Sequence, residues 1–303
     1  MKIGINDLSN YQSKETGNLA SLIKIISNKH NVNTRDLLTQ TLLHLPRLTN
    51  HQTEDQQIIT DEISRLANKI LQTRKGYEYL EESPKSFGFE NLSSEWLQDD
   101  IARIIHEKFH YLGRFRKDSL HIGIFLSASM GRRLAGLATF SDFDQTHIEK
   151  YLPAGLKSGK IKVISRIYAF DWVPKNFASH MIGQAIRSIK NRQPDIKMLI
   201  TYSNPNLKFE GTIYKATNWK LFAKEEIKRY AYLDGNYVTL RSLQEDHNET
   251  DLDLLQSKLG ERLTFSLQPL EPLQIYAYIL DKRLKEYSDQ TNLYDIKKYP
   301  PIA

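Results

Sequence analysis

The sequence predicts an α/β or α+β fold in which a mixed β-sheet is flanked by helices and preceded by a small helical domain. Between Val163 and Trp219, a β-rich segment, a helical segment, a second β-rich segment and a further helical segment follow one another. Upstream, apolar residues recur at the three- and four-residue spacing of amphipathic helices. We therefore expect a helical accessory domain over residues 1–85 and a main domain over residues 92–303.

The individual elements follow from periodicity and from turn residues. In the first domain, apolar spacing predicts helices over residues 19–28, 34–45 and 54–72, the second capped by Asn33 or Thr34. The main domain is expected to open with an amphipathic helix over 94–108 and a hairpin formed by 120–127 and 133–141. After the strand–helix–strand–helix unit, the acidic stretch 244–253 is expected to be a loop, and strands are expected over 220–223, 227–233, 236–240 and 273–280.

Composition limits the class of protein. The chain has 303 residues, of which 40% are apolar and 26% are charged, as is usual for a globular protein. It has no cysteine, which excludes disulfides, thiolate zinc sites and cysteine nucleophiles and fits a cytoplasmic protein. No apolar run approaches the roughly 20 residues that span a membrane, and the first residues lack the apolar core of a secretory signal. We expect a cytoplasmic protein with no membrane segment.

Positive charge is concentrated in one part of the chain. The net charge is +6, but residues 151–243 alone hold 16 Lys or Arg against 6 Asp or Glu. A basic patch of this kind is typical of a protein that binds nucleic acid. The alternative is a solvated surface with cations at helix C-termini, such as Lys190 and Arg192. For residues 1–85 the alternatives are contact with a protein partner and self-association.

The helix that opens near Asn176 is expected to start where the preceding strand ends. Such a helix start presents backbone N–H groups and the positive end of the helix dipole, which suit a phosphate. The sequence therefore predicts a phosphate site over Val173 to Ser179, with Lys175 adding charge. Asn176 and Ser179 are also residue types that cap helices, and capping is compatible with ligand contact by the same backbone.

Two side chains stand out as candidates for chemistry. His110 can act as a general base or bind a metal near neutral pH, or it can simply favour the C-terminal end of a helix. Arg166 interrupts an apolar strand, Val163–Tyr168, where burial requires a partner or an anionic ligand. The alternative is an alternating strand with Arg166 on its solvated face and Ser165 on the opposite one.

Tyr202 is a further candidate, because it ends a parallel strand, and ligands collect at the carboxyl ends of such strands.

The order helix, hairpin, strand, helix, strand, helix and strand resembles that of the GNAT acyltransferase fold. In that fold the pyrophosphate of coenzyme A lies on the loop and helix start after the central strand. The fold's usual Gln/Arg-x-x-Gly-x-Gly/Ala loop is replaced here by Pro174-Lys-Asn-Phe-Ala-Ser179. The resemblance implies acetyl-CoA or a related acyl-CoA as cofactor, with contacts from Val173, Lys175, Asn176, Ala178, Ser179 and Asn218.

Several motifs are more specific than this order of elements. His110-Tyr-Leu-Gly113, Ser165-Arg166, Lys175-Asn176, Ser179 and Gly211–Trp219 resemble the Mom family of phage DNA-modification proteins. That family is GNAT-like and modifies the exocyclic amine of adenine in DNA. Asn176–Gly183 and Phe209–Thr212 look equally like DruA, a component of the Druantia anti-phage system. The resemblance covers roughly residues 94–300.

The Mom resemblance implies roles for residues of this chain. It places DNA as the partner and an iron site at His110 and Tyr111. The chain departs from the family at two places. Tyr202-Ser-Asn-Pro205 stands where the family usually has Tyr-Ala-Asp-Pro, so Asn204 lacks the carboxylate, and Glu210 is the alternative. Phe209-Glu210 stands where the family often has Gly-His before the Gly-Thr pair. The implied catalytic residues are His110, Tyr111, Arg166, Tyr202, Asn204 and Tyr214.

Three functions remain open from the sequence. The first is a Mom-like enzyme that transfers a small acyl-derived group to adenine in DNA. The second is a non-enzymatic, DruA-like DNA-binding component of a defence system, favoured by the missing carboxylate at Asn204. The third is a GNAT acyltransferase that acts on a protein or small molecule. For Trp219, a place in the core and a role in stacking an extruded base are the two alternatives.

Overall fold

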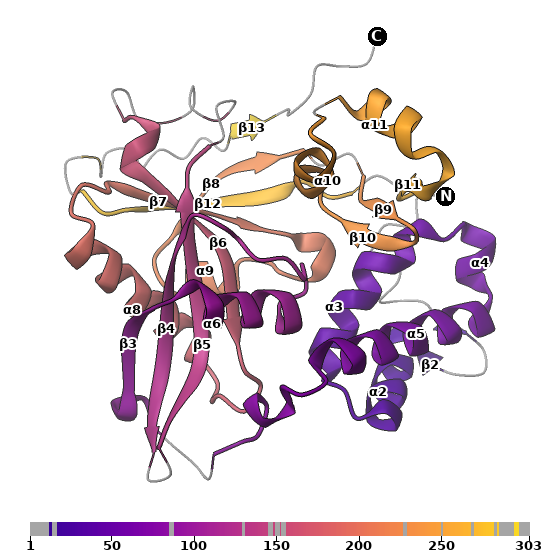
Figure 1. Ribbon diagram of the computed structural model, residues 1–303, viewed down its shortest axis with the longest axis horizontal. Helices are drawn as coiled ribbons and strands as arrows, with labels where there is room; N and C mark the ends of the chain where they lie inside the picture. Colours follow the sequence, from indigo (N-terminus) through magenta and orange to yellow (C-terminus); the bar gives the residue numbers. More distant parts are fainter. Residues whose placement is uncertain are drawn as a thin grey trace. The chain divides into compact units, whose positions relative to one another are not determined.

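The computed structural model shows two compact units. It describes residues 12–13, 17–84, 88–128, 131–144, 148, 152, 156–226, 229–249, 251–267, 270–281, 284 and 294–296. The first unit joins residues 1–75 with 227–271, and the second joins 76–226 with 272–303. The sequence predicts one continuous main domain over 92–303, whereas here a segment inside that range packs with the N-terminal helices (Figure 1).

The N-terminal part of the first unit consists of helices, as the sequence predicts. They are α2 (Leu19–His30), α3 (Thr34–His44), α4 (Asn50–Glu54) and α5 (Gln56–Arg74). The Asn33 side chain accepts a hydrogen bond from the Asp36 N–H at 3.0 Å, which confirms Asn33 as the cap of α3. Apolar residues of the three longer helices, including Ile23, Leu37 and Ile63, form one buried cluster.

The inserted segment adds a small sheet and two helices to the first unit. The sheet has the order β10 (Asn236–Val238), β9 (Ala231–Leu233), β11 (Leu263–Phe265). The stretch 244–253, expected to be a loop, is helical at both ends: 244–247 belong to α10 (Leu240–His247), 252–253 belong to α11 (Leu252–Leu259), and Asn248, Glu249 and Asp251 lie between the two helices. Polar residues cap both helices: the side chains of Thr239 and Asp251 accept hydrogen bonds from the first-turn N–H groups.

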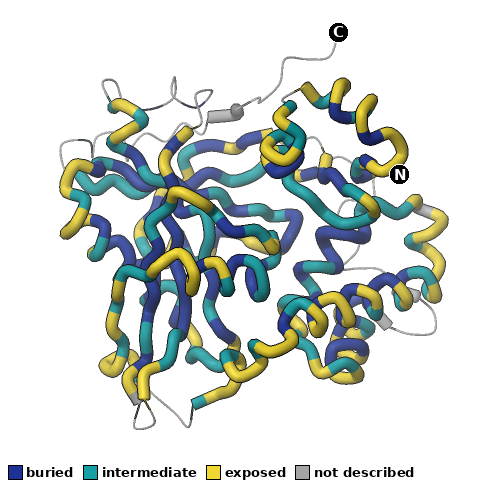
Figure 2. Tube along the Cα trace, in the orientation of Figure 1, coloured by how far each residue is buried: buried dark blue, intermediate teal, exposed yellow. Residues whose placement is uncertain are grey.

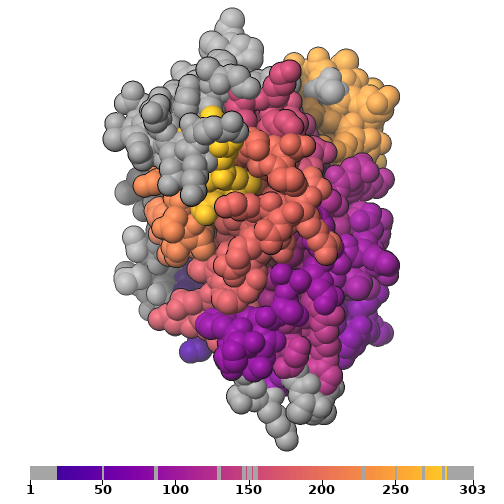
Figure 3. All heavy atoms as spheres, turned by 90° about the vertical axis from the view of Figure 1, so that its left-hand side faces the viewer, coloured from indigo at the N-terminus to yellow at the C-terminus, as the bar shows by residue number. Residues whose placement is uncertain are grey.

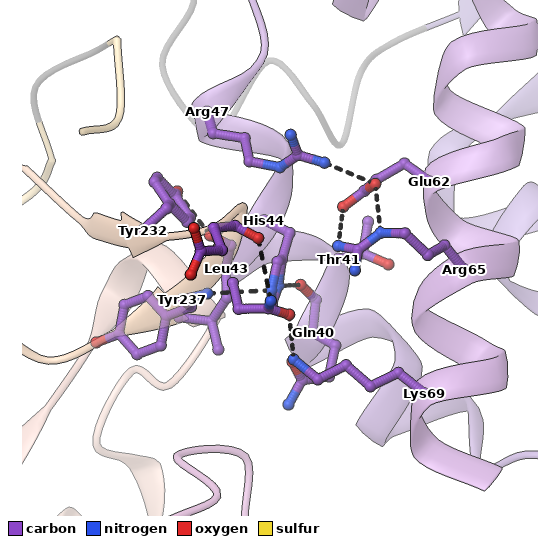
Figure 4. A network of polar contacts seen from close by, with 12 residues as sticks. Gln40, Thr41, Leu43, His44, Arg47, Glu62, Arg65, Lys69, Tyr232 and Tyr237 are labelled. Carbon is purple, nitrogen blue, oxygen red and sulfur yellow. Dashed lines mark hydrogen bonds and ion pairs between the residues drawn. The ribbon is translucent and has the colours of Figure 1, made fainter. Parts of the chain in front are cut away.

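A polar network fastens this small sheet to α3 (Figure 4). The Tyr232 hydroxyl donates to the Leu43 carbonyl at 2.8 Å. His44 bonds through Nδ1 to the Gln40 carbonyl at 2.9 Å, so Nε2 is the acceptor for the Tyr237 N–H at 3.3 Å. Both ring nitrogens are used only when His44 is neutral, and burial lowers its pKa to about 4. The insertion therefore depends on an uncharged imidazole.

The second unit is built on a mixed eight-stranded sheet with the order β13-β8-β12-β7-β6-β5-β4-β3 in the described part of the chain. This sheet, with helices on its faces, confirms the predicted fold class. Pairs within it are antiparallel except β6–β7 and β8–β13. The strands are β3 (Leu92–Leu97), β4 (Ser119–Ala128), β5 (Gly131–Asp142), β6 (Ile161–Ala169), β7 (Met198–Ser203), β8 (Lys220–Glu225), β12 (Leu273–Ile279) and β13 (Tyr294–Ile296).

The predicted helix over 94–108 is wrong in its first half. Residues Leu92–Leu97 form β3, and the helix is α6 (Asp99–Ile104), which continues as a π-helix over Ile105–Phe109. The apolar residues of this stretch fit helical spacing, but Leu92 and Trp96 also fit the two-residue period of a strand, and both pack against the core beside α8. Pairing with β4 decides in favour of the strand.

Helices cover the two faces of the large sheet. On one face, α8 (Phe177–Arg192) packs against Ile122, Ala138 and Phe140. On the other, α6 and the π-helix pack against Leu137 and Tyr168. Because Leu137 and Ala138 are successive strand residues, they point to opposite faces. The central strands are accordingly the most buried part of this unit (Figure 2).

Gly136 on β5 gives a test of the packing under α8. A Cβ at this position would lie 2.7 Å from Met181 Sδ and 2.8 Å from the Tyr168 carbonyl oxygen. Overpacking of this kind costs about 1–3 kcal/mol, so Gly136→Ala should lower the free energy of unfolding measured in urea by that amount. Gly159→Ala is the control, since nothing lies within 4 Å of its Cβ position. Equal stability of the two variants would contradict the packing described here.

His44 gives a pH-dependent stability. Its pKa falls from 6.5 to about 4 on folding, so its contribution is fully present above pH 6.5 and is lost as the pH falls toward 4. The shift corresponds to roughly 3 kcal/mol. Urea unfolding at pH 7 and pH 4.5 should show a smaller pH effect in His44→Gln than in the wild type. The exposed His51 supplies the control variant His51→Gln, which should keep the full wild-type pH effect.

Candidate active site

The centre of the large sheet opens between its two parallel strands. β6 and β7 pair only from Ile161 with Met198 to Ile164 with Thr201. Beyond that point β6 stays paired with β5, and β7 stays paired with β12. The pairing of β7 with β12 brings two distant parts of the chain together. In Figure 3, atoms coloured salmon, from the part of the chain that includes β7, lie beside yellow atoms from near the C-terminal end. The carboxyl-terminal halves of β6 and β7 therefore present backbone edges that no longer pair with each other.

Arg166 lies on β6 just past the last paired residue. Thr139 of β5 is opposite Arg166, and Phe140 is opposite Ile164, so Ser165 is an additional residue, a β-bulge. The Ser165 hydroxyl lies 2.7 Å from Ser141 Oγ, and Arg166 lowers the pKa of histidines packed on that same face. Ser165 and Arg166 therefore share one face, which corrects the expectation that they point in opposite directions.

His110 and Tyr111 follow directly on the π-helix. The His110 N–H donates to the Ile105 carbonyl at 2.9 Å, and His110 Nδ1 accepts from the Leu112 N–H at 3.2 Å. Nε2 therefore carries the hydrogen of the neutral ring and is a donor. Burial, then Arg166 and then His106, hold the pKa of His110 well below its usual value. The imidazole is thus neutral near pH 7.

Tyr111 lies against His110. Its ring centroid lies 4.5 Å from that of His110. Burial raises the pKa of Tyr111, and the positive charge of Arg166 opposes that rise. Arg166 is paired opposite Thr139, which His106 contacts, and the His106 ring lies 6.3 Å from that of His110. The three sequence-predicted residues therefore lie around the same histidine cluster. All three can donate hydrogen bonds: an imidazole N–H, a phenol and a guanidinium.

The other two tyrosines lie on opposite faces of the sheet. Tyr214 packs in the core beneath α8, where Thr201 Oγ1 lies 3.0 Å from its hydroxyl and burial raises its pKa to about 12. Tyr202 points to the other face, where its hydroxyl is buried with no hydrogen-bond partner in the described part of the chain. Burial, Glu225 and Asp144 raise the pKa of Tyr202. Tyr202 immediately follows the last β7 residue that pairs with β6.

The loop after β7 uses its polar residues to hold its own shape. Asn204 caps a 3₁₀ turn, Pro205–Leu207: its Oδ1 accepts from the Asn206 N–H at 3.1 Å and from Asn206 Nδ2 at 2.9 Å. An aspartate could accept the same bonds, so the amide that replaces the family's carboxylate keeps a structural role. The Glu210 carbonyl accepts from the Tyr276 hydroxyl at 3.3 Å.

The segment that ends this region agrees with the sequence. Asn218 adopts the left-handed conformation, with φ 63°, after the short helix α9 (Thr212–Lys215), as predicted for a residue that ends a helix. Trp219 is 3% exposed and packs against Tyr214 and Tyr278, so it belongs to the core.

The expected phosphate site lies in the turn between β6 and α8. Asn176 adopts the left-handed conformation, with φ 68°, and its side chain makes no cap hydrogen bond, so the predicted capping by Asn176 is wrong. It takes the place of a glycine in the turn. The Val173 N–H is bonded to the Phe170 carbonyl at 3.3 Å and is not available to a ligand. Lys175 is exposed, and Ala178 and Ser179 lie half-buried in the first turn of α8.

Sequence reasoning missed the buried polar residues beside His110. His106 Nε2 and His121 Nδ1 both lie 3.0 Å from Thr139 Oγ1, and all three residues are at most 1% exposed. His106 Nδ1 accepts from the Arg116 N–H at 3.4 Å. Both nitrogens of His106 are therefore used within the protein, and burial lowers its pKa to about 3. The sequence did hold a signal for this cluster, because side chains of paired strands that face each other lie on the same face of the sheet. His121 and Thr139 are such a pair in the hairpin that the sequence predicts.

The donor set gives no support to an iron site. Across the described residues, no group of three or more His, Cys, Asp or Glu side chains is placed to hold a metal ion. The three histidines here are used in hydrogen bonds with Thr139 and with backbone N–H groups.

Among the described residues, no helix is both long and apolar enough to cross a membrane.

The fold and the site define an α/β protein whose sheet opens beside a buried cluster of hydrogen-bond donors. Its sequence matches the model of the Mom protein family over residues 91–301. Since that is more than half of its 303 residues, the chain belongs to the Mom protein family. The resemblance to DruA is not shown, and no curated protein matches the chain.

Solved structures similar to this chain include several acetyltransferases. RimL, the ribosomal L7/L12 alpha-N-protein acetyltransferase, is 11% identical with a TM-score of 0.35, covering 65% of this chain and 97% of that one. The ribosomal-protein-S5-alanine acetyltransferase from Vibrio fischeri is 9% identical with a TM-score of 0.38, covering 66% and 98%. NAA60 from Arabidopsis thaliana, solved with acetyl-CoA, is 9% identical with a TM-score of 0.36, covering 62% and 98%.

Thr139 offers a test of the buried polar cluster. Thr139→Val keeps the shape of the side chain but leaves His106 and His121 without their shared hydroxyl. Unsatisfied buried polar groups cost about 1–3 kcal/mol, so the free energy of unfolding in urea should fall by about that amount. Thr139→Ser keeps the hydroxyl and should retain most of the stability. If valine and serine had equal effects, the hydrogen bonds would not be what stabilises this position.

Proposed function

We propose that this protein is a GNAT-like transferase that uses an acyl-CoA and modifies the exocyclic amine of adenine in DNA. The observation that carries the proposal is the end of β6–β7 pairing after Ile164 and Thr201, beside the donor group His110, Tyr111 and Arg166. Membership of the Mom protein family supports the choice of DNA as substrate.

The residues around the opened strands fit an acyl-CoA. Past Ile164 and Thr201, the facing edges of β6 and β7 are free of each other, which leaves backbone groups for an extended amide-containing chain. The Tyr202 hydroxyl, buried with no partner among the described residues, is a further polar atom at this place. The turn after β6 leads into α8, whose N-terminus suits a phosphate, with Lys175 beside it. When bound, the cofactor would supply an activated acyl group.

The chain's own residues would act on charge. As an amine formed a bond to the acyl carbon, the acyl oxygen would gain negative charge, and fixed donors in a water-poor site would stabilise it. The carbon–sulfur bond of the thioester would then break, and coenzyme A would leave as the thiol with the proton lost by the amine. His110 Nε2 and the Arg166 guanidinium are donors held by a helix end and a β-bulge respectively. Tyr111 adds a phenol whose raised pKa keeps it protonated near pH 7. In this tautomer His110 would polarise the acyl group rather than take a proton.

Mass spectrometry of nucleosides tests this function. DNA from cells that express the wild type should contain a modified deoxyadenosine. His110→Ala and Arg166→Gln should each lower its amount by roughly 10²–10³-fold, the usual effect of losing one such donor. Lys258→Gln, which changes an exposed lysine of the first unit outside the basic segment 151–243, is the control and should leave the adduct unchanged.

Calorimetry with acetyl-CoA separates the two halves of the proposal. Binding without any adenine adduct would exclude DNA adenine as the substrate and leave an acyltransferase with another acceptor. Absence of both binding and adduct would overturn the proposed function.

A further inference from the structure

Phe209 is an exposed aromatic ring beside the donor group. It is 36% exposed, and its ring centroid lies 5.7 Å from that of Tyr111. Tyr111 in turn lies against His110, and its pKa responds to Arg166. Phe209 therefore offers an apolar ring surface to solvent next to the residues proposed to act on the acyl group.

The loop that carries Phe209 is held in place from several sides. The Ser203 hydroxyl donates to the Phe209 carbonyl at 2.5 Å, and the Phe209 N–H donates to the Asn204 carbonyl at 3.2 Å. The Tyr276 hydroxyl donates to the next carbonyl, that of Glu210. These hydrogen bonds hold the backbone at Phe209 and Glu210, from which the Phe209 ring projects.

Two left-handed residues flank Phe209. Lys208 has φ 62°, a conformation that costs a residue with a side chain roughly 1 kcal/mol or more. Gly211 has φ 69°, and a Cβ there would lie 2.4 Å from the ring of Tyr276. Only glycine fits this close approach. Strained backbone that is held so firmly is found preferentially at functional positions.

Trp219, the residue that the sequence offered for base stacking, is buried in the core. Phe209 is the aromatic residue that is open to a ligand beside His110 and Tyr111. Two cations lie close to Phe209 in the sequence: Lys208 and Lys215 are both exposed. An apolar ring next to cations is the combination that binds single-stranded nucleic acid, by stacking the base and neutralising the phosphate.

We propose that Phe209 stacks an unpaired adenine of single-stranded or extruded DNA and so positions the acceptor base, with Lys208 and Lys215 contacting the flanking phosphates. The proposal rests on the proposed function, because it names the subsite that holds the acceptor. A base stacked on Phe209 would lie beside Tyr111, since the two ring centroids are 5.7 Å apart.

A double comparison by fluorescence anisotropy tests the subsite without any reaction. The probes are two fluorescein-labelled 12-mers: one consists entirely of abasic residues, and the other carries a single central adenine. Stacking of one base contributes about 1–3 kcal/mol, so the wild type should bind the adenine-containing strand roughly 5- to 150-fold tighter than the abasic one. Phe209→Leu should reduce this ratio to about one, and Phe209→Trp should keep it.

Phe89→Leu is the matched control. Phe89 is also 36% exposed, but its ring stacks on His180 at a centroid distance of 4.8 Å. The Phe89→Leu variant should therefore keep the wild-type ratio of the two affinities. Thermal unfolding of each variant checks that the fold is kept. Equal binding of both probes by the wild type, or an unchanged ratio in folded Phe209→Leu, would overturn the subsite.

The outcomes separate the subsite from the reaction. A Phe209-dependent ratio without any adenine adduct in cellular DNA would support the subsite and exclude the proposed chemistry. An adduct that forms equally well in wild type and Phe209→Leu would support the chemistry and exclude the subsite.

Discussion

The arrangement of the second unit depends on the point at which β6 and β7 stop pairing. Each strand keeps one neighbour, β5 or β12, so neither loses its place in the sheet when the ladder between them ends. The bulge at Ser165 belongs to the same feature, since a bulge bends a strand and increases its twist. It also places Arg166 on the face where His106 and His110 are packed. One irregularity in β6 thus opens the sheet and supplies the guanidinium beside the opening.

A half-buried cation near three buried histidines is compatible with folding when the imidazoles remain neutral. Burial lowers the pKa of His106, His110 and His121, and the charge of Arg166 lowers the first two further. Hydrogen bonds enforce the same state: Nδ1 of His106 and of His110 each accepts from a backbone N–H. The cluster therefore carries one fixed positive charge across the neutral pH range.

Local patterns in the sequence identified much of this fold, and contacts between distant segments account for what they missed. Asn33, Asn218 and Trp219 adopt the states expected from their own residue types and neighbours. The prediction of a helix over 94–108 was wrong in its first half because Trp96 fits both the helical and the strand spacing of apolar residues. Only the pairing of this segment with β4 decides between the two. The insertion over 227–271 was invisible because its partner, α3, lies nearly 200 residues away, as the Tyr232–Leu43 bond shows. No local pattern reports such a contact.

The site was predicted in the same uneven way. His110, Tyr111 and Arg166 lie around one histidine cluster, because a helix end and a strand interior are features that sequence can locate, and their catalytic roles stay a prediction. Ser165 was placed on the wrong face, since strict alternation does not anticipate a bulge. Asn204 caps a turn through its side-chain amide, so its difference from the family's aspartate is compatible with an intact loop. An adenine amine is a weak nucleophile whose attack would gain more from activation of the acyl group than from a strong base. In the proposed reaction, a site of neutral and cationic donors, with its histidines held uncharged, would meet that requirement without a carboxylate at position 204.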